Sequence, residues 1–278
     1  MTATSSTVPS AIALAQSIES KIIAMGDAAL QKHCQSFFKT RPGEYGEGDI
    51  FCGVKVPPVR ALAKKHKKEA SLPIISALLD AKVHEVRFAG LVFLSDLARD
   101  TFRKNPHCAL HDWQEPLQMG RKSQFLRSLP VAVQDCTLED CMKLYLARQD
   151  AINNWDLVDI SAPWLLGPLL AQGEDGAVWA LAKTGELWKE RVAIVATLYT
   201  ARQGMAHYSL ALAEYFLGHE HDLIHKACGW VLREAGKKAP DALLSFLDAH
   251  AALMPRTMLR YAIERQDTGT RARYMAAK

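Results

Sequence analysis

Hydrophobic positions recur at helical spacing in nearly every segment of the chain from about residue 10 onward. Ile18, Ile22 and Ile23 lie at positions i, i+4 and i+5, and the leucines at 243–247 repeat the same pattern. Alternating hydrophobic and polar runs, which would indicate β-strands, are scarce. The pattern therefore predicts an almost entirely α-helical protein.

Prolines interrupt this pattern at or near the predicted helix boundaries, where a residue without a backbone N–H is best tolerated. Their spacing predicts helices of roughly 10–16 residues, a common length in soluble helical domains. The prolines concerned are Pro57, Pro58, Pro73, Pro106, Pro116, Pro130, Pro163, Pro168, Pro240 and Pro255.

Several predicted helices begin alike, with a basic residue beside a run of small hydrophobic residues. Arg87, Arg191, Lys226 and Arg256 occupy this position, and the last three are 35 and 30 residues apart. Loose periods of roughly 30–45 residues, each long enough for two helices, favour an α-solenoid of HEAT-like helix pairs. In such a solenoid the second helix of each pair would line a concave face, and the basic residues would form a stripe along it. An ordinary helical bundle is the alternative interpretation.

Composition is typical of a folded globular chain, because 49% of the 278 residues are hydrophobic and 23% are charged. The chain has no run of about 18 hydrophobic residues, so no membrane span is expected. Its six cysteines form no Cys-x-x-Cys pair, which favours reduced thiols and a cytoplasmic location. We expect a flexible tail at residues 1–9 and one domain at 10–278.

Positive charge is concentrated, although the formal net charge is only +4. One basic region runs from Lys55 to Lys68, and residues 225–278 contain ten Lys or Arg against five acids. Such patches suit contacts with phosphate groups. A solvated helix face is the alternative interpretation.

The segment at 153–159 is the most unusual in the chain. Asn153 or Asn154 would cap a helix, which places Trp155 and Asp159 on one face and Asp156 in the first turn. On spacing alone, a simpler interpretation is preferred: the tryptophan packs in the core and the aspartates cap the helix or bind basic partners.

A second segment, at 226–234, places Trp230 on one helix face with Lys226 and Arg233. Gly229 beside it would allow a neighbouring backbone or a ligand to approach closely. Arg191, in a third segment, could reach a phosphate or form an ion pair. A tryptophan between cations suggests a platform beside a phosphate-bearing ligand, with core packing as the alternative.

Histidine groups at 219–225 and 107–111 could in principle hold zinc, but neither supplies four clear ligands. No motif for a nucleotide, a dinucleotide or a hydrolase nucleophile occurs. We therefore expect no metal and no other cofactor.

Four stretches carry a resemblance to a known family: NNWDLVD, WKERVAIV, KACGWVLREAGKKAPDALLSF and FCGVKVPPVRALAKKH. They closely resemble the DNA alkylation repair glycosylases of the AlkD-like, HEAT-like-repeat family, in the same order and over most of residues 20–265. The chain departs from the family at Asn154, where close relatives often carry another aromatic residue that would affect the grip on the duplex. The stretch at 103–150 is also longer than the family core needs.

The resemblance implies a monofunctional DNA glycosylase that excises cationic N3-alkyladenine and N7-alkylguanine from duplex DNA during base excision repair. Asp159 matches the catalytic carboxylate, Trp155 and Trp230 match the tryptophans that flank the deoxyribose of the lesion, and Arg191 matches an arginine near the DNA backbone. The partner would be double-stranded DNA containing alkylated bases, bound by a monomer. Two alternatives are a non-catalytic HEAT-repeat binder of bent, branched or damaged DNA and a protein-binding helical scaffold.

The expected DNA-contacting residues come from the second and third segments and from the first basic region. They are Arg191, Lys226, Arg233, Lys55, Arg60, Lys64 and Lys65.

Overall fold

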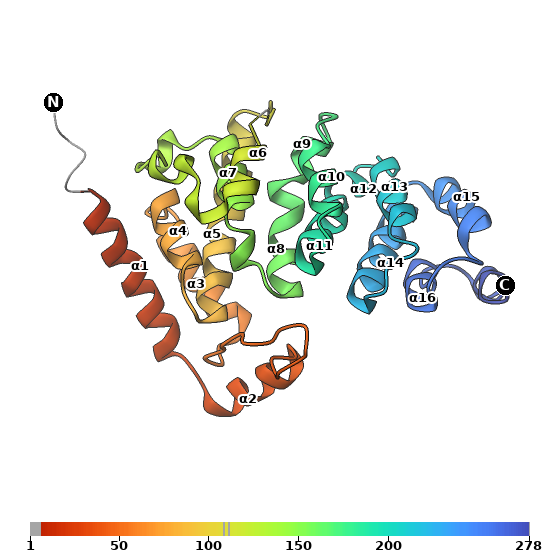
Figure 1. The fold of residues 1–278 in the computed structure, drawn as a ribbon, viewed down its shortest axis with the longest axis horizontal. Helices are drawn as coiled ribbons and strands as arrows, with labels where there is room; N and C mark the ends of the chain where they lie inside the picture. The colour runs from red at the N-terminus through yellow and green to blue at the C-terminus, as the bar shows by residue number, and fades with distance from the viewer. Residues whose placement is uncertain (1–6, 108, 111, 278) are drawn as a thin grey trace. The chain divides into compact units, whose positions relative to one another are not determined.

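The computed structural model describes residues 7–107, 109–110 and 112–277. Within these residues every regular element is a helix, apart from an isolated β-bridge between Ile50 and Val83 (Figure 1). The predicted all-α class is therefore confirmed. The chain divides into two compact units, an N-terminal unit that ends at Ser161 and a C-terminal unit that begins at Ala162.

The N-terminal unit is built around one long, almost wholly buried helix. Its helices are α1 (Thr7–Ala24), α2 (Ala28–Phe37), α3 (Val56–His66), α4 (Leu72–Leu79), α5 (His84–Lys104), α6 (Gln114–Met119) and α7 (Leu138–Ala147). Four 3₁₀ turns follow α6 or α7: η1 (Gly120–Lys122), η2 (Gln124–Arg127), η3 (Val133–Asp135) and η4 (Gln149–Ala151).

α5 is the central helix of this unit, because α1, α3, α4 and α7 all pack against it. Val86, Leu91 and Leu94 are fully buried on it. Burial of each such side chain contributes about 1.5–3 kcal/mol. The first residues of α5 are thus held on a rigid support, and the candidate site begins there.

α8 (Trp155–Leu165) contains the last residue of the N-terminal unit and the first residue of the other. The C-terminal unit continues with α9 (Gly167–Leu170), α10 (Gly176–Ala182), α11 (Leu187–Ala196), α12 (Leu198–Ala201), α13 (His207–Tyr215), α14 (Asp222–Gly236), α15 (Pro240–His250), α16 (Arg256–Ala262) and α17 (Thr268–Met275). α14 is central here, since α11, α13, α15 and α16 pack against it.

Consecutive helices pack as pairs within each unit: α4 with α5, α10 with α11, and α13 with α14. Arg87 and Lys226 lie in the first two turns of the second helix of a pair, and Arg191 lies in the middle of the shorter α11. The predicted organisation into helix pairs is therefore confirmed, whereas the HEAT-like character of the repeats and the concave DNA-binding face stay predictions.

Three details differ from the sequence analysis. α1 already begins at Thr7, so residues 7–9 of the expected tail are helical, and the rest of that tail lies outside the described residues. Pro163 lies inside α8, near its C-terminal end. The expected helix length of roughly 10–16 residues is wrong for many of the described helices: α5 has 21 residues and α1 has 18, whereas α4, α6, α9, α10, α12, α13, α16 and α17 have fewer than ten. The length of α5 is stabilised by packing on several sides.

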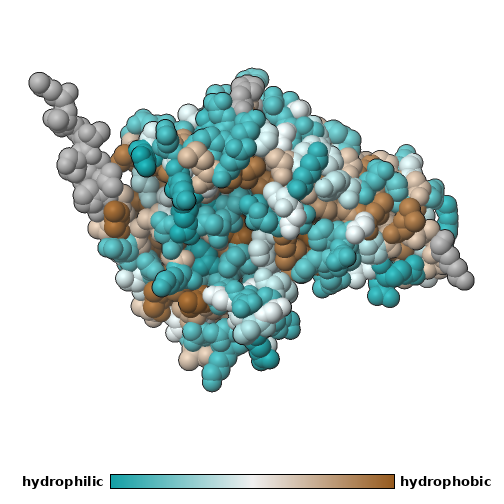
Figure 2. Space-filling view, in the orientation of Figure 1, coloured by the Kyte–Doolittle hydropathy of each residue, from teal (hydrophilic) through white to brown (hydrophobic). Residues whose placement is uncertain are grey.

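The visible surface in Figure 2 is mostly polar, with hydrophobic residues in small groups. In the described part of the chain, no helix has both the length and the hydrophobicity needed to cross a membrane.

A glycine determines how closely α16 approaches α14. A Cβ atom on Gly229 would lie 2.5 Å from the carbonyl oxygen of Met258 and 2.5 Å from Cβ of Tyr261. The close approach is therefore to a neighbouring backbone, one of the two possibilities that the sequence left open.

We expect Gly229→Ala to lower the free energy of unfolding by about 1–3 kcal/mol, because overpacking outweighs the better helix propensity of alanine. Gly218→Ala is the control, since a Cβ there meets nothing within 4 Å. Urea denaturation of the three proteins measures both effects. Equal stability of the two variants would contradict this account of the α14–α16 packing.

Candidate functional site

Trp155 and Asp159 lie together at the beginning of α8. The helix begins at Trp155, so Asp156 is in its first turn, as predicted. Trp155 and Asp159 are four residues apart and therefore share one side of the helix. Both are partly exposed. One helix thus presents an indole and a carboxylate side by side.

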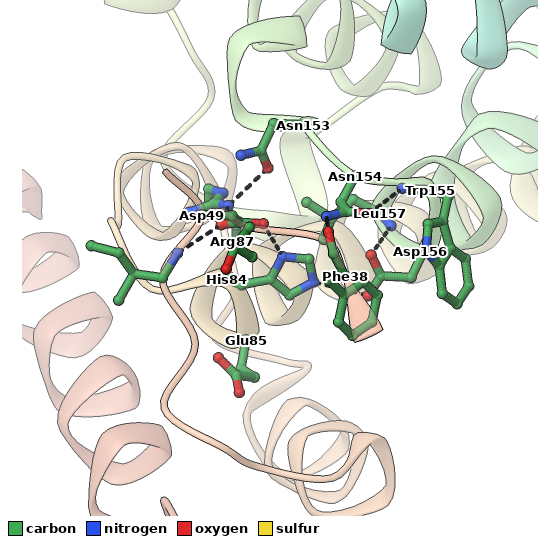
Figure 3. Close-up of polar contacts among 12 residues, drawn as sticks. Phe38, Asp49, His84, Glu85, Arg87, Asn153, Asn154, Trp155, Asp156 and Leu157 are labelled. Carbon is green, nitrogen blue, oxygen red and sulfur yellow. Dashed lines mark hydrogen bonds and ion pairs between the residues drawn. The ribbon is translucent and has the colours of Figure 1, made fainter. Parts of the chain in front are cut away.

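A buried histidine joins the beginning of α8 to the beginning of α5 (Figure 3). His84 lies between two carboxylates: its Nδ1 is 2.7 Å from Oδ2 of Asp49 and its Nε2 is 2.9 Å from Oδ2 of Asp156. The side chains of His84 and Asp49 are only 2% and 0% exposed. An acceptor at each ring nitrogen favours the doubly protonated imidazolium. His84 therefore binds both aspartates through charged hydrogen bonds.

The opposite charges of His84 and the two aspartates offset the free-energy cost of burying them. Burial alone would lower the pKa of His84, but the hydrogen bonds and charges of Asp156 and Asp49 outweigh it and raise that pKa to about 9. Burial would likewise raise the pKa of Asp49, but His84 and Arg87 together lower it. His84 and Asp49 are therefore both charged at neutral pH.

Arg87, one turn along α5, completes the group. Its Nη2 lies 2.5 Å from Oδ1 of Asp49 and donates to Oδ1 of Asn153 at 2.9 Å, while its Nε donates to the carbonyl of Ala151 at 3.1 Å. We call Asp49, His84, Arg87 and Asp156 the buried charge cluster; it pairs two aspartates with two cations.

The predicted basic stripe is wrong for Arg87 and for Arg191. They are 6% and 5% exposed, and their guanidinium groups donate to backbone carbonyls of the protein. A guanidinium group has five donors, which suits it to joining segments inside the protein.

Asn154 is fully buried behind the site. Its Nδ2 donates to the carbonyl of Phe38 at 3.3 Å, and its Oδ1 accepts the N–H of Trp155 at 2.9 Å. A Cβ on Gly46 would lie 2.8 Å from that Nδ2, so the loop at 39–49 also packs against it. Asn154 is therefore too deeply buried to contact a duplex directly. It holds the first turn of α8 against the end of α2.

Aromatic rings fix the orientation of Trp155. Its ring stacks on Phe38 with the centroids 5.2 Å apart, and Phe37 meets it edge-on at 5.8 Å. Phe38 also stacks on Phe51 at 4.8 Å, and Phe51 stacks on His84 at 4.2 Å. Such offset and edge-on pairs are each worth about 0.5–1.5 kcal/mol beyond burial. The indole plane is thus set by a stack that ends on the buried charge cluster.

Sequence reasoning missed this support for Trp155. The adjacent pair Phe37-Phe38 was visible, and so was a histidine at the beginning of a predicted helix. Neither carries a local signal that it meets residue 155 or 156.

A cavity of about 140 Å³ lies beside the aromatic stack, with Cys34 and Glu85 in its wall. The carboxylate of Glu85 accepts the backbone N–H groups of Cys52, Gly53 and Val54 at 2.8–3.1 Å and so fixes that loop. Burial and then the charge of Glu85 raise the pKa of Cys34, and they raise that of Cys52 to about 12. Both thiols are therefore protonated at neutral pH and are poor nucleophiles.

The third residue of the predicted catalytic set, Trp230, belongs to the C-terminal unit, as do three of the predicted DNA-contacting cations. Trp230 is partly exposed on α14. Two cations on this helix bind carboxylates: Nζ of Lys226 is 2.8 Å from Oδ2 of Asp222, and Arg233 pairs with Glu264. Arg191 donates through Nη1 to the carbonyl of Leu223 at 2.7 Å, which ties α11 to the first turn of α14. A DNA contact by these cations stays a prediction.

The first basic region forms an exposed patch on α3 and the residue before it. Lys55, Arg60, Lys64 and Lys65 are all exposed. The guanidinium carbon of Arg60 lies 5.7 Å from the centroid of the Phe88 ring, a cation–π distance.

Among the described residues, no group of three or more His, Cys, Asp or Glu side chains is arranged to hold a metal ion. The histidines at 219–225 make structural hydrogen bonds: Nε2 of His219 lies 3.0 Å from Glu190, and Nδ1 of His221 caps α14. In the second predicted group, Cys108 and His111 lie outside the described residues.

Comparison with known families gives one decisive match. The family model described as "DNA alkylation repair enzyme" matches residues 18–265. The chain belongs to this family. The match includes both units and every residue predicted for the site, so the resemblance seen in the four sequence stretches is confirmed. No curated protein matches the chain.

The buried charge cluster makes stability depend on pH in a defined direction. Because the pKa of His84 is raised above its ordinary value of about 6.5, its stabilising contribution is complete below that value and is lost as the pH rises through about 9. We expect the free energy of unfolding to fall between pH 6.5 and 9, and the fall to be much smaller in His84→Gln. Urea denaturation at a series of pH values measures it.

His207→Gln is the matched control, because His207 is exposed. It should keep the wild-type pH dependence. The assignment of charge to His84 is wrong if His84→Gln and wild type lose stability in parallel over this pH range.

Proposed function

We propose that this DNA alkylation repair enzyme is a monofunctional DNA glycosylase. It hydrolyses the N-glycosidic bond of cationic alkylpurines, N3-alkyladenine and N7-alkylguanine, in duplex DNA, as the first step of base excision repair. One observation carries the proposal: a carboxylate, Asp159, and an indole, Trp155, share a partly exposed side of a helix whose first turn is fixed by buried charges. Family membership supports the repair of alkylated DNA.

The chemistry needs little more than these two groups. A cationic alkylpurine is already a good leaving group, so no general acid is required. The sugar develops oxocarbenium character as the bond breaks, as in glycoside hydrolysis. A carboxylate about 4 Å from that charge, at an effective dielectric constant near 20, stabilises it by about 4 kcal/mol, which corresponds to about a thousandfold in rate. Asp159 supplies this charge and orients the attacking water.

Asp159 suits this role better than Asp156, although both lie on α8. Asp156 is bound to His84 and accepts the N–H of Leu157 at 2.9 Å, so its charge is already matched inside the protein. Asp159 lies near the core: burial raises the pKa of Tyr145, and the charge of Asp159 raises it further. A carboxylate next to a region of low dielectric constant acts more strongly on a developing cation.

The indole of Trp155 adds attraction to the same charge. A cation over a tryptophan face gains about 0.5–2 kcal/mol. The stack of Phe37 and Phe38 on Trp155 keeps the ring in one orientation, so no ordering is needed when the substrate binds. In our proposal Trp230 flanks the deoxyribose as a second indole, as the family resemblance implies. The resemblance also places Arg191 near the DNA backbone; because Arg191 is largely buried, its proposed role there is to hold the first turn of α14 through its bond to the carbonyl of Leu223.

The basic residues of the protein complete the proposal. Lys55, Arg60, Lys64 and Lys65 contact phosphates of the duplex from α3, and Lys226 and Arg233 do so from α14. The enzyme acts as a monomer in the cytoplasm, on double-stranded DNA with alkylated bases, and requires no cofactor.

The direct test is release of N7-methylguanine from methylated duplex DNA by Asp159→Asn in single turnover. The amide keeps the shape of the side chain and removes its charge, so we expect a loss of about a thousandfold in rate. Binding of the alkylated duplex should survive within a few fold. A non-catalytic DNA binder would bind the duplex without releasing the base even as wild type.

Asp156→Asn is the matched control, one residue from Trp155 on the same helix. It weakens the charged bond to His84, so we expect lower stability while the folded enzyme keeps most of its rate of base release. A large rate loss in Asp156→Asn with little loss in Asp159→Asn would reverse the assignment of the two carboxylates.

Substrate charge provides a separate prediction. Without a general acid, the enzyme should release N7-methylguanine at least about a hundredfold faster than hypoxanthine or uracil, whose neutral bases need protonation to leave. The comparison uses duplexes of one sequence that carry a single lesion each. Comparable rates for the neutral bases would require a proton donor that this mechanism does not contain.

A further inference from the structure

The last residues of the chain are a second strongly basic stretch besides residues 55–68. Residues 256–278 contain six basic and two acidic residues, which gives this segment a formal charge of +4. The segment includes α16, α17 and the turn between them, and it is therefore one of the two places where the protein would attract a polyanion.

The cations of this segment are almost all arginines. Five of its six basic residues are Arg, whereas the basic region at 55–68 has five Lys and one Arg. Guanidinium groups bind phosphate through two parallel hydrogen bonds and are more weakly hydrated than ammonium groups. The composition thus favours phosphate contacts over general solubility.

Two of these arginines are occupied within the C-terminal unit. Arg256 donates to the carbonyl of Met275, at the end of α17. Arg273 pairs with Asp248 at 2.5 Å and lies over the ring of Tyr274. Both tie α17 to its neighbours.

Three other arginines have no such internal role. Arg260 on α16, Arg265 in the turn and Arg271 on α17 are exposed, and their side chains make no hydrogen bond or ion pair with the described residues. α16 and α17 pack against each other, so the three residues belong to one small substructure. Their guanidinium groups are available to an external anion.

The two carboxylates of the segment already have partners. Glu264 pairs with Arg233 of α14. Asp267 caps α17 and accepts both the N–H and the hydroxyl of Thr270. Neither neutralises the three exposed arginines by direct contact.

We propose that Arg260, Arg265 and Arg271 form a DNA-contacting surface of the C-terminal unit that binds backbone phosphates of a duplex. The duplex as ligand rests on the proposed function, while the site rests on three exposed arginines whose side chains have no partner among the described residues. Arg271 lies beyond the part of the chain that the family model matches. In this proposal α17 therefore adds a DNA contact outside the matched residues. Because phosphates are present at every nucleotide, this surface holds damaged and undamaged duplex equally well.

The test measures binding of an undamaged duplex of about 20 base pairs over a range of salt concentrations. The triple variant Arg260→Gln/Arg265→Gln/Arg271→Gln should bind at least about tenfold more weakly at 0.1 M salt, and the slope of log K against log salt should fall by about 2.7, or about 0.9 for each lost phosphate contact. The triple Arg→Lys variant keeps the charges and should keep the slope. Thermal melting of the variants should match wild type, since the three side chains are exposed.

The control removes three exposed cations elsewhere, in Arg103→Gln/Lys122→Gln/Arg202→Gln, and should change the slope little. Wild-type affinity and slope in the first triple variant, or an equal loss in the control, would overturn the proposal. The duplex carries no lesion, so the result does not depend on base release. If wild type binds the duplex but releases no methylated base, the proposed glycosylase activity is wrong, while the proposed DNA-contacting surface is still supported.

Discussion

The bridge of His84 between Asp49 and Asp156 is the interaction on which the candidate site depends. The imidazolium is the first residue of the central helix of its unit, and it binds the first turn of the helix that carries Trp155 and Asp159. Burying these charges separately would be very unfavourable, but pairing them and completing their hydrogen bonds through Arg87 makes the arrangement stable. Loss of one partner leaves an uncompensated buried charge, which typically destabilises a protein by about 3–5 kcal/mol.

The same physical constraint separates the roles of two neighbouring aspartates. Asp156 is held by His84, so its charge positions the helix and is not left for a substrate. Asp159, one turn later on the partly exposed side, carries the charge that the proposed chemistry uses. The aromatic stack that begins at His84 and ends on Trp155 connects both functions, because the group that fixes the helix also sets the plane of the indole.

Local sequence signals predicted the parts of this site that depend on helical spacing. The helix beginning at Trp155, the common face of Trp155 and Asp159, and the place of Asp156 in the first turn all follow from residues within a few positions of one another. The partners could not be predicted, because His84 and Asp156 are 72 positions apart and Asn154 and Phe38 are 116 apart. Charge patterning had the same limit: it identified the basic regions, but not that Arg233 pairs with Glu264 while the side chain of Arg260 has no partner among the described residues.

The protonation state of His84 tests the central claim most directly. Nitrogen-15 chemical shifts of the labelled imidazole report whether both ring nitrogens carry hydrogen, in the folded protein and without any substitution. The account predicts a doubly protonated ring throughout pH 6–8 that loses its proton near pH 9. A ring that is neutral at pH 7 would contradict it, because the beginning of α8 would then not be held by a buried ion pair.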